Sequence, residues 1–389
     1  MDLFAGVGGF TEGFSSARAG GKQLFSPRLL VDKDPDAAAS FRFNRPDTPY
    51  LVTDLTKIDA GMLLKSAGLS EGELDVLIGG PPCQGFSVLM RNKTLDDPRN
   101  ELVHVFLRFV LELRPKLVLM ENVPNFRAVA KGAIWERMFD LLRDKYEVRN
   151  EVLNAYDYGV PQWRRRMFVV GLRKDIGIQG FDFPMVRDSR RAAAKRLTPG
   201  STQDKLLPIV KPWVTVGDAI GDLPSLRAGE DADFYDKAPF TDYQAARRRK
   251  SVVLRNHVAR KHDSRFLDKL AKIREGGSNL ELDGRKKFDR RREIKYLSQA
   301  YGRLHREGIA HTITAHFLNP GSGRFIHYRD LRSITVREAA RFQSFNDDFV
   351  FCGSLQAQQR LVGNAVPPLM SRALAEYFGE ILLKAGAND

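Results

Sequence analysis

The first 184 residues alternate short apolar runs with segments whose apolar residues recur at helical spacing. Strands buried in a parallel sheet are indicated by mostly apolar runs at 29–31, 76–78, 117–120 and 166–171. Between them, residues 35–43 and 101–113 read as helices, and the second helix ends before Pro115. This alternation is typical of βαβ units, so we predict an α/β fold on a Rossmann-like, mostly parallel sheet.

The pattern changes after residue 184. Prolines, glycines and basic clusters, such as those at 247–250 and 290–292, interrupt a weak periodicity up to about residue 325. We predict three segments: a first domain over 1–184, a smaller and irregular domain over 185–325, and a return to the first domain over 326–389. In the last segment, Thr335 and Glu338 have the spacing of a capping box, and residues 368–383 read as an amphipathic closing helix.

The positive charge is concentrated in the middle of the chain. The 389 residues carry a formal net charge of +14. Residues 185–325 hold 30 Lys and Arg against 17 Asp and Glu, whereas the rest of the chain holds 32 against 31. A basic excess alone also fits a solvated surface, or an RNA, DNA or anionic-lipid partner. Its confinement to one segment favours a polyanion-binding module inserted into a neutral catalytic body.

The composition is that of an ordinary globular protein, with 43% hydrophobic and 28% charged residues. The sequence contains neither a signal-peptide pattern nor an apolar run long enough to span a membrane. Its two cysteines, Cys83 and Cys352, suggest no obvious disulfide or metal site. We therefore expect a reducing, intracellular setting.

Residues 79–87 read Gly-Gly-Pro-Pro-Cys-Gln-Gly-Phe-Ser, directly after a predicted strand. Two glycines allow a tight turn and two prolines stiffen it, so Cys83 is held at a sheet edge, where α/β folds bind their ligands. A cysteine at this position is also compatible with a role in packing. Packing, however, needs neither four turn-forming residues nor the polar pair that follows, so we interpret Cys83 as a nucleophile.

A glycine-rich turn opens the chain, where residues 2–10 read Asp-Leu-Phe-Ala-Gly-Val-Gly-Gly-Phe. Such a turn lets the backbone approach a ligand closely, although it also occurs as a simple tight turn. Asp32 ends the next predicted strand, where Rossmann-like sites bind ribose hydroxyls, and Asp54 follows the third strand. Together these residues predict a site for an adenosine-containing cofactor.

Two further polar blocks accompany predicted strands. Glu121 follows the run 117–120, where its carboxylate can share a pocket with Cys83 or can cap the next segment. Arg164 and Arg166 alternate after Gln162, so on one strand the three side chains face the same way. Two arginines on one face suit an anion or a polarised carbonyl, and the alternative is a solvated basic run.

In this order, the blocks resemble the cytosine-C5 DNA methyltransferase family. The matching pieces are the Phe-Ala-Gly-x-Gly-Gly start, the Pro-Pro-Cys loop, the Glu-Asn-Val block and the Gln-x-Arg-x-Arg block. Two late blocks complete the set, Arg-Glu-Ala-Ala-Arg-Phe-Gln-Ser-Phe at 337–345 and Gly-Asn-Ala-Val-Pro-Pro at 363–368. The resemblance covers about residues 2–183 and 326–385. It implies an S-adenosylmethionine-dependent methyltransferase sheet with a smaller DNA target-recognition domain, in a bacterial single-chain enzyme of the restriction-modification type.

The resemblance also implies a mechanism. Cys83, as a thiolate, adds to C6 of a cytosine flipped out of the duplex. Glu121 forms hydrogen bonds with the ring at N3 and with the exocyclic amine, Arg164 holds the O2 carbonyl, and Arg166 supports Cys83 and the base. C5 then takes the methyl group of S-adenosylmethionine, and loss of the C5 proton and of Cys83 releases 5-methylcytosine.

For the cofactor, the resemblance implies a cradle that binds S-adenosylmethionine. Its residues are Phe4, Gly6 and Gly8 in the turn, Asp32 at the ribose, Asp54 at the adenine amine, and Pro81, Asn364 and Val366 completing the pocket. The chain departs from the family pattern in two places. The first strand is nearly absent before Asp2, and Lys33 stands where the family often has an apolar residue.

The expected macromolecular partner is duplex DNA. By resemblance, residues 86–100 form a lid whose Arg91, Lys93 and Arg99 meet phosphates. In the middle domain, the candidates for base or backbone contacts are Thr312, Thr314, His316, Phe317, Arg324 and His327. A cognate restriction endonuclease is a second expected partner, the expected location is the cytoplasm with association to the nucleoid through DNA, and neither a membrane nor a metal is expected.

Three alternatives compete with this interpretation. A tRNA cytosine-C5 methyltransferase shares the catalytic core, but a basic insert of this length suits duplex reading better, and the cysteine loop ends in Gly85-Phe86-Ser87. A catalytically silent DNA-binding relative would typically have lost Cys83, Glu121 or an arginine, and all are present. A dinucleotide oxidoreductase leaves both Cys83 and the basic segment unexplained.

Overall fold

The computed structural model describes residues 1–82, 101–178, 180–184, 213–249, 251–281 and 299–386. The chain forms two compact units. The first unit comprises Met1–Asn154, Arg165–Met185 and Val366–Asp389, and the second comprises Ala155–Arg164 and Val186–Ala365. Residues 326–365 thus fold with the second unit. The predicted domain boundaries at residues 184 and 325 describe a division by expected function, and they stay a prediction.

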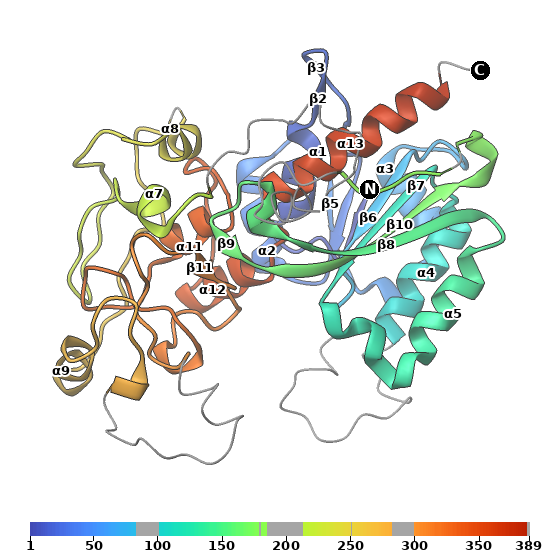
Figure 1. Ribbon diagram of the computed structural model, residues 1–389. Helices are drawn as coiled ribbons and strands as arrows, with labels where there is room; N and C mark the ends of the chain where they lie inside the picture. Colours follow the sequence, from blue (N-terminus) through green and yellow to red (C-terminus); the bar gives the residue numbers. More distant parts are fainter. Residues whose placement is uncertain (83–100, 179, 185–212, 250, 282–298, 387–389) are drawn as a thin grey trace, which may run out of the picture. The chain divides into compact units, whose positions relative to one another are not determined.

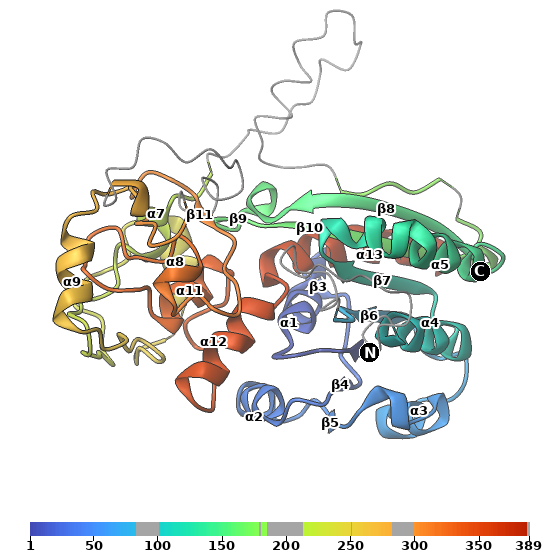
Figure 2. The ribbon, with the colours of Figure 1, turned by 90° about the horizontal axis from the view of Figure 1, so that it is seen from below.

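A seven-stranded sheet forms the centre of the first unit, with the order β5-β4-β1-β6-β7-β10-β8 (Figure 2). The first five strands in this order are parallel, and β10 runs antiparallel between β7 and β8. The predicted α/β fold on a mostly parallel sheet is confirmed. The strands are β1 (Asp2–Leu3), β4 (Leu30–Asp32), β5 (Tyr50–Val52), β6 (Val76–Gly79), β7 (Leu117–Asn122), β8 (Tyr146–Asn154) and β10 (Arg165–Arg173).

Alternate side chains of these strands enter cores on both faces of the sheet. Val118 and Met120 of β7 join a core that also contains Phe106 of helix α4. On β10, Phe168 packs edge-on against Phe10 of α1, with the ring centroids 6.2 Å apart. Burial on both faces explains why these strands are nearly continuous apolar runs. The helices are α1 (Gly9–Ser16), α2 (Pro35–Asn44), α3 (Ala60–Ala67), α4 (Glu101–Leu113), α5 (Ala133–Leu142) and α13 (Pro368–Gly386).

Short elements complete the first unit. A small hairpin consists of β2 (Arg18–Ala19) and β3 (Lys22–Gln23). Single turns of 3-10 helix occur at η1 (Leu55–Lys57) and η5 (Lys174–Ile176), and a longer 3-10 segment is η3 (Pro124–Gly132). β1 has only two residues although it lies between β4 and β6, so the first strand is as short as the sequence indicates.

The C-terminal helix belongs to the first unit and lies beside α1 (Figure 1). Ser371 Oγ of α13 donates a hydrogen bond to the Phe10 carbonyl at 2.6 Å. A Cβ atom on Gly13 would approach the Ser371 side chain to 2.3 Å, so only glycine permits this helix contact. The predicted closing helix is thereby confirmed, and it extends to Gly386.

The second unit has little regular structure among its described residues. Its elements are β9 (Gln162–Trp163), β11 (Ala310–His311), α7 (Val216–Ile220), α8 (Asp242–Arg248), α9 (Ser264–Ala271), α11 (Val336–Phe342), α12 (Leu355–Asn364), and the 3-10 turns η4 (Ala155–Tyr158), η6 (Asn279–Glu281) and η7 (Pro320–Ser322). α11 begins at the predicted capping box, in which Thr335 Oγ1 accepts from Glu338 N at 3.2 Å and Thr335 N donates to Glu338 Oε2 at 2.8 Å.

Arginines bind many of the backbone carbonyls in this irregular unit. Arg303 donates to the carbonyls of Ile273, Tyr328 and Arg329. Arg324 donates to those of Gly276, Gly277 and Arg303. A carbonyl removed from water and left without a donor costs about as much free energy as a lost hydrogen bond. These guanidinium groups therefore supply the donors that a sheet or helix would otherwise provide.

Candidate active site

The parallel strands of the first unit end at one edge of the sheet, which we call the carboxyl edge. Most of the predicted site residues of this unit lie at this edge: Phe4 and Gly6 after β1, Asp32 at the end of β4, Asp54 after β5, Pro81 after β6, and Glu121 within the last two residues of β7. Ligands of open α/β sheets bind outside the carboxyl ends of the strands. The structure therefore brings several predicted cofactor residues and Glu121 of the catalytic set to one edge.

The glycine-rich turn after β1 has a left-handed backbone. Phe4, Gly6 and Gly8 have φ angles of 56°, 51° and 80°. The two glycines are required for different reasons. A Cβ atom on Gly8 would lie 2.5 Å from the ring of Phe41 in α2, whereas one on Gly6 would meet nothing within 4 Å. Gly8 is thus a packing glycine, and Gly6 borders open space that a ligand can fill.

Asp32 is bonded directly to this turn. Its Oδ2 accepts from Gly6 N at 2.8 Å, and its Oδ1 accepts from Asp34 N at 3.0 Å. Burial raises the pKa of Asp32, and the two backbone donors oppose that shift. A carboxylate has about four acceptor positions, so Asp32 retains capacity for hydroxyl donors such as those of a ribose. The open space beside Gly6 and this acceptor fit an adenosine-containing cofactor.

Asp54 has a local structural role at the third strand. Its Oδ1 accepts from both the backbone N and the Oγ1 of Thr56, at 3.0 and 2.8 Å, and so caps η1. These two hydrogen bonds lower the pKa of Asp54. The carboxylate is therefore ionised and fixed in place, and its contact with an adenine amine stays a prediction.

At the end of β7, Glu121 forms an ion pair with Arg166 of β10. Arg166 Nε lies 2.9 Å from Glu121 Oε1, and both side chains are largely buried. The strand register explains the pair, because Glu121 lies opposite Phe168, and Arg166 is two residues away on the same face of β10. Burial lowers the pKa of Arg166, and the carboxylate of Glu121 opposes that shift.

The loop before Cys83 is attached to the same strand end. Asn122 Nδ2 donates to the Pro81 carbonyl at 3.2 Å, and a Cβ atom on Gly80 would lie 3.5 Å from Glu121 Oε2. The backbone of the loop at Gly80 thus lies beside the carboxylate. We had not singled out Asn122 as a site residue, although it stands in the Glu-Asn-Val block. Cys83 itself lies outside the described residues, as do Arg91, Lys93 and Arg99.

The expectation that Gln162, Arg164 and Arg166 share one strand face is wrong. The chain leaves the strand conformation at Arg164, so β9 and β10 belong to different sheets. Arg164 is 2% exposed, and its guanidinium donates to the carbonyls of Ile313, Gly363 and Ala365. Its partners are therefore backbone carbonyls of the second unit, whereas Arg166 pairs with Glu121 in the first.

Gln162 joins the same buried network in the second unit. Its Nε2 donates to Phe342 O at 3.0 Å and to Gln343 Oε1 at 2.8 Å, and its Oε1 accepts from Ile313 N at 2.8 Å. Gln343 in turn donates to the Val362 carbonyl at 2.7 Å. Three of the sequence blocks, Gln-x-Arg-x-Arg, Arg-Phe-Gln-Ser-Phe and Gly-Asn-Ala-Val, thus meet in one hydrogen-bonded network.

Asn364 is exposed at the end of α12 in the second unit, and Val366 is buried in the first. Gly363, just before Asn364, packs directly on the chain at Thr314, since a Cβ atom would lie 2.4 Å from the Thr314 carbonyl group. The network therefore fixes the backbone on both sides of Asn364. Contacts of Asn364 and Val366 with a cofactor stay predictions.

The candidates for DNA contacts differ in their surroundings. Thr312 Oγ1 donates to the Trp163 carbonyl at 2.7 Å, and Thr314 Oγ1 accepts from His316 N at 3.3 Å. His316 is exposed, and Arg324 binds three carbonyls as described above. Two further candidates are wrong: Phe317 is 0% exposed and His327 is 2% exposed, because both belong to the core of the second unit.

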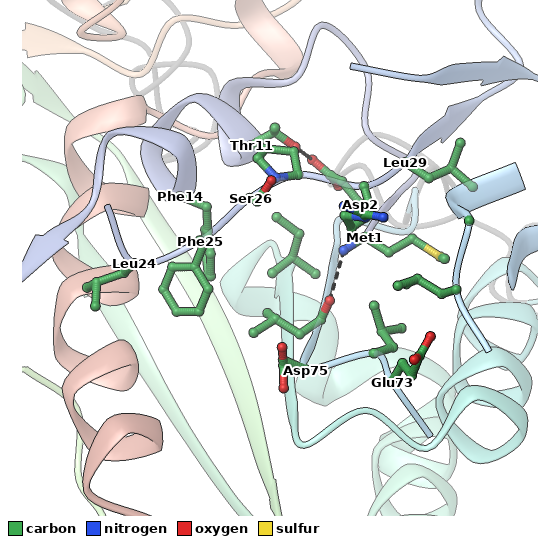
Figure 3. Close-up of a pocket in the computed structure, with 17 residues that line it drawn as sticks. Met1, Asp2, Thr11, Phe14, Leu24, Phe25, Ser26, Leu29, Glu73 and Asp75 are labelled. Carbon is green, nitrogen blue, oxygen red and sulfur yellow. Dashed lines mark hydrogen bonds between the residues drawn. The ribbon is translucent and has the colours of Figure 1, made fainter. Parts of the chain in front are cut away.

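A cavity of about 690 Å³ lies at the opposite, amino edge of the sheet, lined by residues that include Met1, Asp2, Leu29 and Val76 (Figure 3). The N-terminal ammonium donates to the Val76 carbonyl at 2.9 Å, and Thr11 Oγ1 donates to Asp2 Oδ2 at 2.6 Å. Burial lowers the pKa of the ammonium to about 6 and raises the pKa of Asp2 to about 7. Because ligands of such sheets bind at the carboxyl edge, this cavity is not the predicted cofactor site.

Among the described residues, no helix has the length and apolar character that crossing a membrane requires. Within the same residues, His, Cys, Asp and Glu side chains form no group of three or more able to hold a metal ion.

Comparison with known proteins identifies a family. A family model described as C-5 cytosine-specific DNA methylase matches residues 1–380. The type II methyltransferase M.DdeI of Desulfomicrobium norvegicum is 35% identical over 412 residues, which cover 100% of this chain and 91% of that protein. The type II methyltransferase M1.HphI of Haemophilus parahaemolyticus is 36% identical over 392 residues, which cover 100% and 87%.

Solved structures share the fold. One is a prophage-encoded E. coli protein that is described as a DNA modification methyltransferase. It superposes with a TM-score of 0.73 at 25% identity over 98% of each chain. The Dnmt2 methyltransferase of S. pombe superposes with a TM-score of 0.57 at 15% identity, over 98% of this chain and 97% of that one.

Proposed function

The chain belongs to the C-5 cytosine-specific DNA methylase family and is a DNA cytosine methyltransferase, and from this premise we propose how its residues act. The enzyme transfers a methyl group from S-adenosylmethionine to C5 of a cytosine flipped out of a specific duplex sequence. The observation that carries this proposal is the Arg166–Glu121 pair at the end of β7, beside the loop that leads to Cys83.

Glu121 and Arg166 act on the cytosine ring. C5 of cytosine is a poor nucleophile until electron density is pushed into the ring. A proton on Glu121 is donated to N3, and the carboxyl group accepts a hydrogen bond from the exocyclic amine, so that negative charge does not accumulate on the base. Arg166 Nε holds the Glu121 carboxyl group in one orientation at 2.9 Å. Its Nη1 also donates to the Arg165 carbonyl at 2.8 Å, and we assign its Nη2 N–H groups to the base.

Cys83 supplies the nucleophile. Its thiolate forms a bond to C6, and the displaced π electrons make C5 nucleophilic. S-adenosylmethionine, when bound, supplies the electrophilic methyl group. After C5 has gained the methyl group, a base removes the C5 proton, the C5–C6 double bond re-forms, and the thiolate of Cys83 leaves. The products are 5-methylcytosine and S-adenosylhomocysteine.

The cofactor is bound at the carboxyl edge of the sheet. Asp32 accepts the ribose hydroxyls, and the open space beside Gly6 takes the ligand against the backbone. Phe4, Gly8, Asp54, Pro81, Asn364 and Val366 complete the set carried over by resemblance. These residues fit the cofactor because Asp32 has unused acceptor positions and because Gly6 beside it leaves room for the ligand.

For Arg164 we propose a positioning role in place of the contact with cytosine O2. Its guanidinium donates to three carbonyls. Those of Gly363 and Ala365 lie on either side of Asn364. The third, that of Ile313, lies between Thr312 and Thr314. Arg164 thereby fixes the backbone that carries a predicted cofactor residue and two predicted DNA contacts. We assign the contact with the O2 atom of cytosine to Arg166 instead.

The DNA partner is bound by the basic middle segment and by the lid predicted at 86–100. Arg91, Lys93 and Arg99 meet phosphates, and Thr312, Thr314, His316 and Arg324 lie in the part that reads the target. A cognate restriction endonuclease of the same specificity is the second proposed partner. We assign the enzyme to the cytoplasm, associated with the nucleoid through DNA.

The test is methyl transfer from labelled S-adenosylmethionine to mixed duplex DNA and, separately, to tRNA, with Cys83→Ala alongside. Label in DNA that is lost in Cys83→Ala supports the proposal, and mapping of 5-methylcytosine then gives the recognition sequence. Label in tRNA alone would assign the same chemistry to RNA. DNA binding without any transfer by the wild-type protein would identify a silent relative.

A further inference from the structure

The backbone of Gly6 is held at its N–H and at its carbonyl by side chains that belong to neighbouring strands. Its N–H donates to Asp32 Oδ2 of β4 at 2.8 Å. Its carbonyl accepts a hydrogen bond from Tyr50 Oη of β5, also at 2.8 Å. Tyr50 lies 44 residues further along the chain and was not among the residues that the sequence pointed to. The two hydrogen bonds together fix the peptide groups on both sides of the Gly6 Cα atom.

The turn needs such support, because its own conformation is costly. Phe4 is a non-glycine residue at φ 56°, a region that L-residues occupy only under constraint. On the side of Gly6 where a Cβ atom would project, no atom lies within 4 Å. Packing therefore does not hold that side of the turn. The fixed orientation of Gly6 depends on hydrogen bonds, to which Tyr50 contributes the one at the carbonyl.

The Tyr50 side chain is itself rigidly placed. It is 6% exposed, and its ring packs against that of Phe41, with the centroids 5.7 Å apart. Phe41 is also the residue that contacts Gly8. Burial raises the pKa of Tyr50 far above its usual range. The hydroxyl therefore remains a hydrogen-bond donor at every pH at which the enzyme is folded.

We propose that Tyr50 is a positioning residue for the cofactor. By holding the Gly6 carbonyl it orients the Gly6 N–H, which in turn orients the Asp32 carboxylate toward the ribose hydroxyls. The proposal rests on the assignment of the carboxyl edge as the S-adenosylmethionine site. Without the Tyr50 hydroxyl, the peptide group after Gly6 can rotate, which loosens the Gly6 backbone and with it the donor that orients Asp32 Oδ2.

The experiment compares Tyr50→Phe with Tyr146→Phe in the full chain. Tyr146 is a matched control in the same unit, because it is also buried and its Oη donates to a backbone carbonyl, that of Pro115, at 3.0 Å. Burial raises its pKa as well, to about 12. Pro115 precedes β7, so this hydrogen bond lies at the amino edge, away from the cofactor site. Each variant loses one hydroxyl and nothing else.

The readout is the dissociation constant of S-adenosylhomocysteine, measured by titration calorimetry without DNA. We expect Tyr50→Phe to weaken binding by about three- to tenfold, the effect of one buried hydrogen bond, and Tyr146→Phe to leave it unchanged. In steady-state assays, KM for S-adenosylmethionine should rise in Tyr50→Phe while kcat is retained, as for an interaction made equally in the ground and transition states.

Equal affinity in Tyr50→Phe and wild type would overturn the proposal. So would a similar loss of affinity in both variants, because that points to general destabilisation. If the wild-type chain fails to bind S-adenosylhomocysteine at all, the cofactor assignment under the proposed function fails as well. The two failures are therefore distinguished by the wild-type titration alone.

Discussion

Arg332 and Glu338 form a bidentate ion pair in the core of the second unit. Nη1 of Arg332 lies 2.8 Å from Oε2 of Glu338, and Nη2 lies 2.8 Å from Oε1. Both side chains are almost completely excluded from solvent. Glu338 also caps α11 through the backbone N of Thr335, and Arg332 binds Asp330. One carboxylate thus caps the N-terminus of α11 and neutralises a buried arginine at the same time.

Glu338→Gln should therefore be strongly destabilising. The change removes one of the two carboxylates that neutralise Arg332, and the loss of one partner of a buried pair costs about 3–5 kcal/mol. The matched control is Glu376→Gln in α13, whose partner Arg372 is 42% exposed and lies 2.7 Å away in an i,i+4 pair. That change should cost at most about 0.5 kcal/mol. Urea unfolding measures both, and similar losses in the two variants would contradict the prediction.

The stability of the second unit should fall below about pH 6.5, the ordinary pKa of histidine. Burial lowers the pKa of His327 to about 3, although Glu338 and Asp330 act in the opposite direction. Nδ1 of His327 accepts from the backbone N of Arg329 and of Asp330, at 3.2 and 2.9 Å, so protonation there breaks both hydrogen bonds. Because the unfolded chain binds the proton first, stability is complete above the unfolded pKa and declines as the pH falls toward 3.

The measurement is the difference in urea midpoint between pH 7.5 and pH 5.0. His327→Gln should be less stable than wild type at pH 7.5 but should show a smaller difference between the two pH values. Burial also lowers the pKa of His262, to about 4, but that residue contributes equally in both proteins. Asp330 and Asp347, with pKa values of about 2, add a loss only below about pH 4. An unchanged pH dependence in His327→Gln would contradict the assignment.

Arg164 and Arg166 should differ sharply in what their removal changes. Arg166→Ala removes the partner of Glu121, so kcat should fall by about 10²–10³ while the unfolding midpoint changes little. Arg164→Ala frees three buried carbonyls and should lower the unfolding midpoint strongly. Arg165→Ala, an exposed neighbour, is the control and should be neutral in both assays. Loss of kcat without destabilisation in Arg164→Ala would restore a direct role for Arg164 at the base.

Gly6→Ala should weaken cofactor binding beyond the cost of backbone strain. Gly20 offers a matched control, since its φ of 54° is close to the 51° of Gly6 and a Cβ atom would meet nothing within 4 Å at either position. Both substitutions should cost about 1–2 kcal/mol of stability. Only Gly6→Ala should also reduce the affinity for S-adenosylhomocysteine. Equal affinities in the two variants would place the ligand away from Gly6.

Local sequence signals predicted the regular elements well. The helix expected at 101–113 is α4 with the same bounds, and the capping box at Thr335 and Glu338 is formed as expected. Both depend on residues close together in the chain. The strand expected through Gln162, Arg164 and Arg166 failed for the opposite reason. Arg164 donates to the carbonyls of Ile313, Gly363 and Ala365, which are distant in the sequence, so no local pattern reveals these contacts.

The charge pattern misled in a similar way. Every residue of α11 is buried, including the charged residues Arg337, Glu338 and Arg341. Arg341 is neutralised by Asp222 and Asp347, and Asp222 lies 119 residues away in the sequence. Some of the arginines that suggested a polyanion-binding surface, such as Arg303 and Arg324, instead hold the backbone together. Net charge therefore overstates the basic surface available to DNA.

The arginines that bind carbonyls give the second unit an unusual freedom. A carbonyl oxygen is present at every position of a chain, whatever side chain that position carries. An anchor such as Arg324, which holds Gly276, Gly277 and Arg303 by their carbonyls, does not depend on side chains elsewhere in the loop. Under the proposed function, the course of a loop that reads DNA can thus be kept while the residues displayed along it are exchanged, so that a new target sequence can be acquired without building a new scaffold.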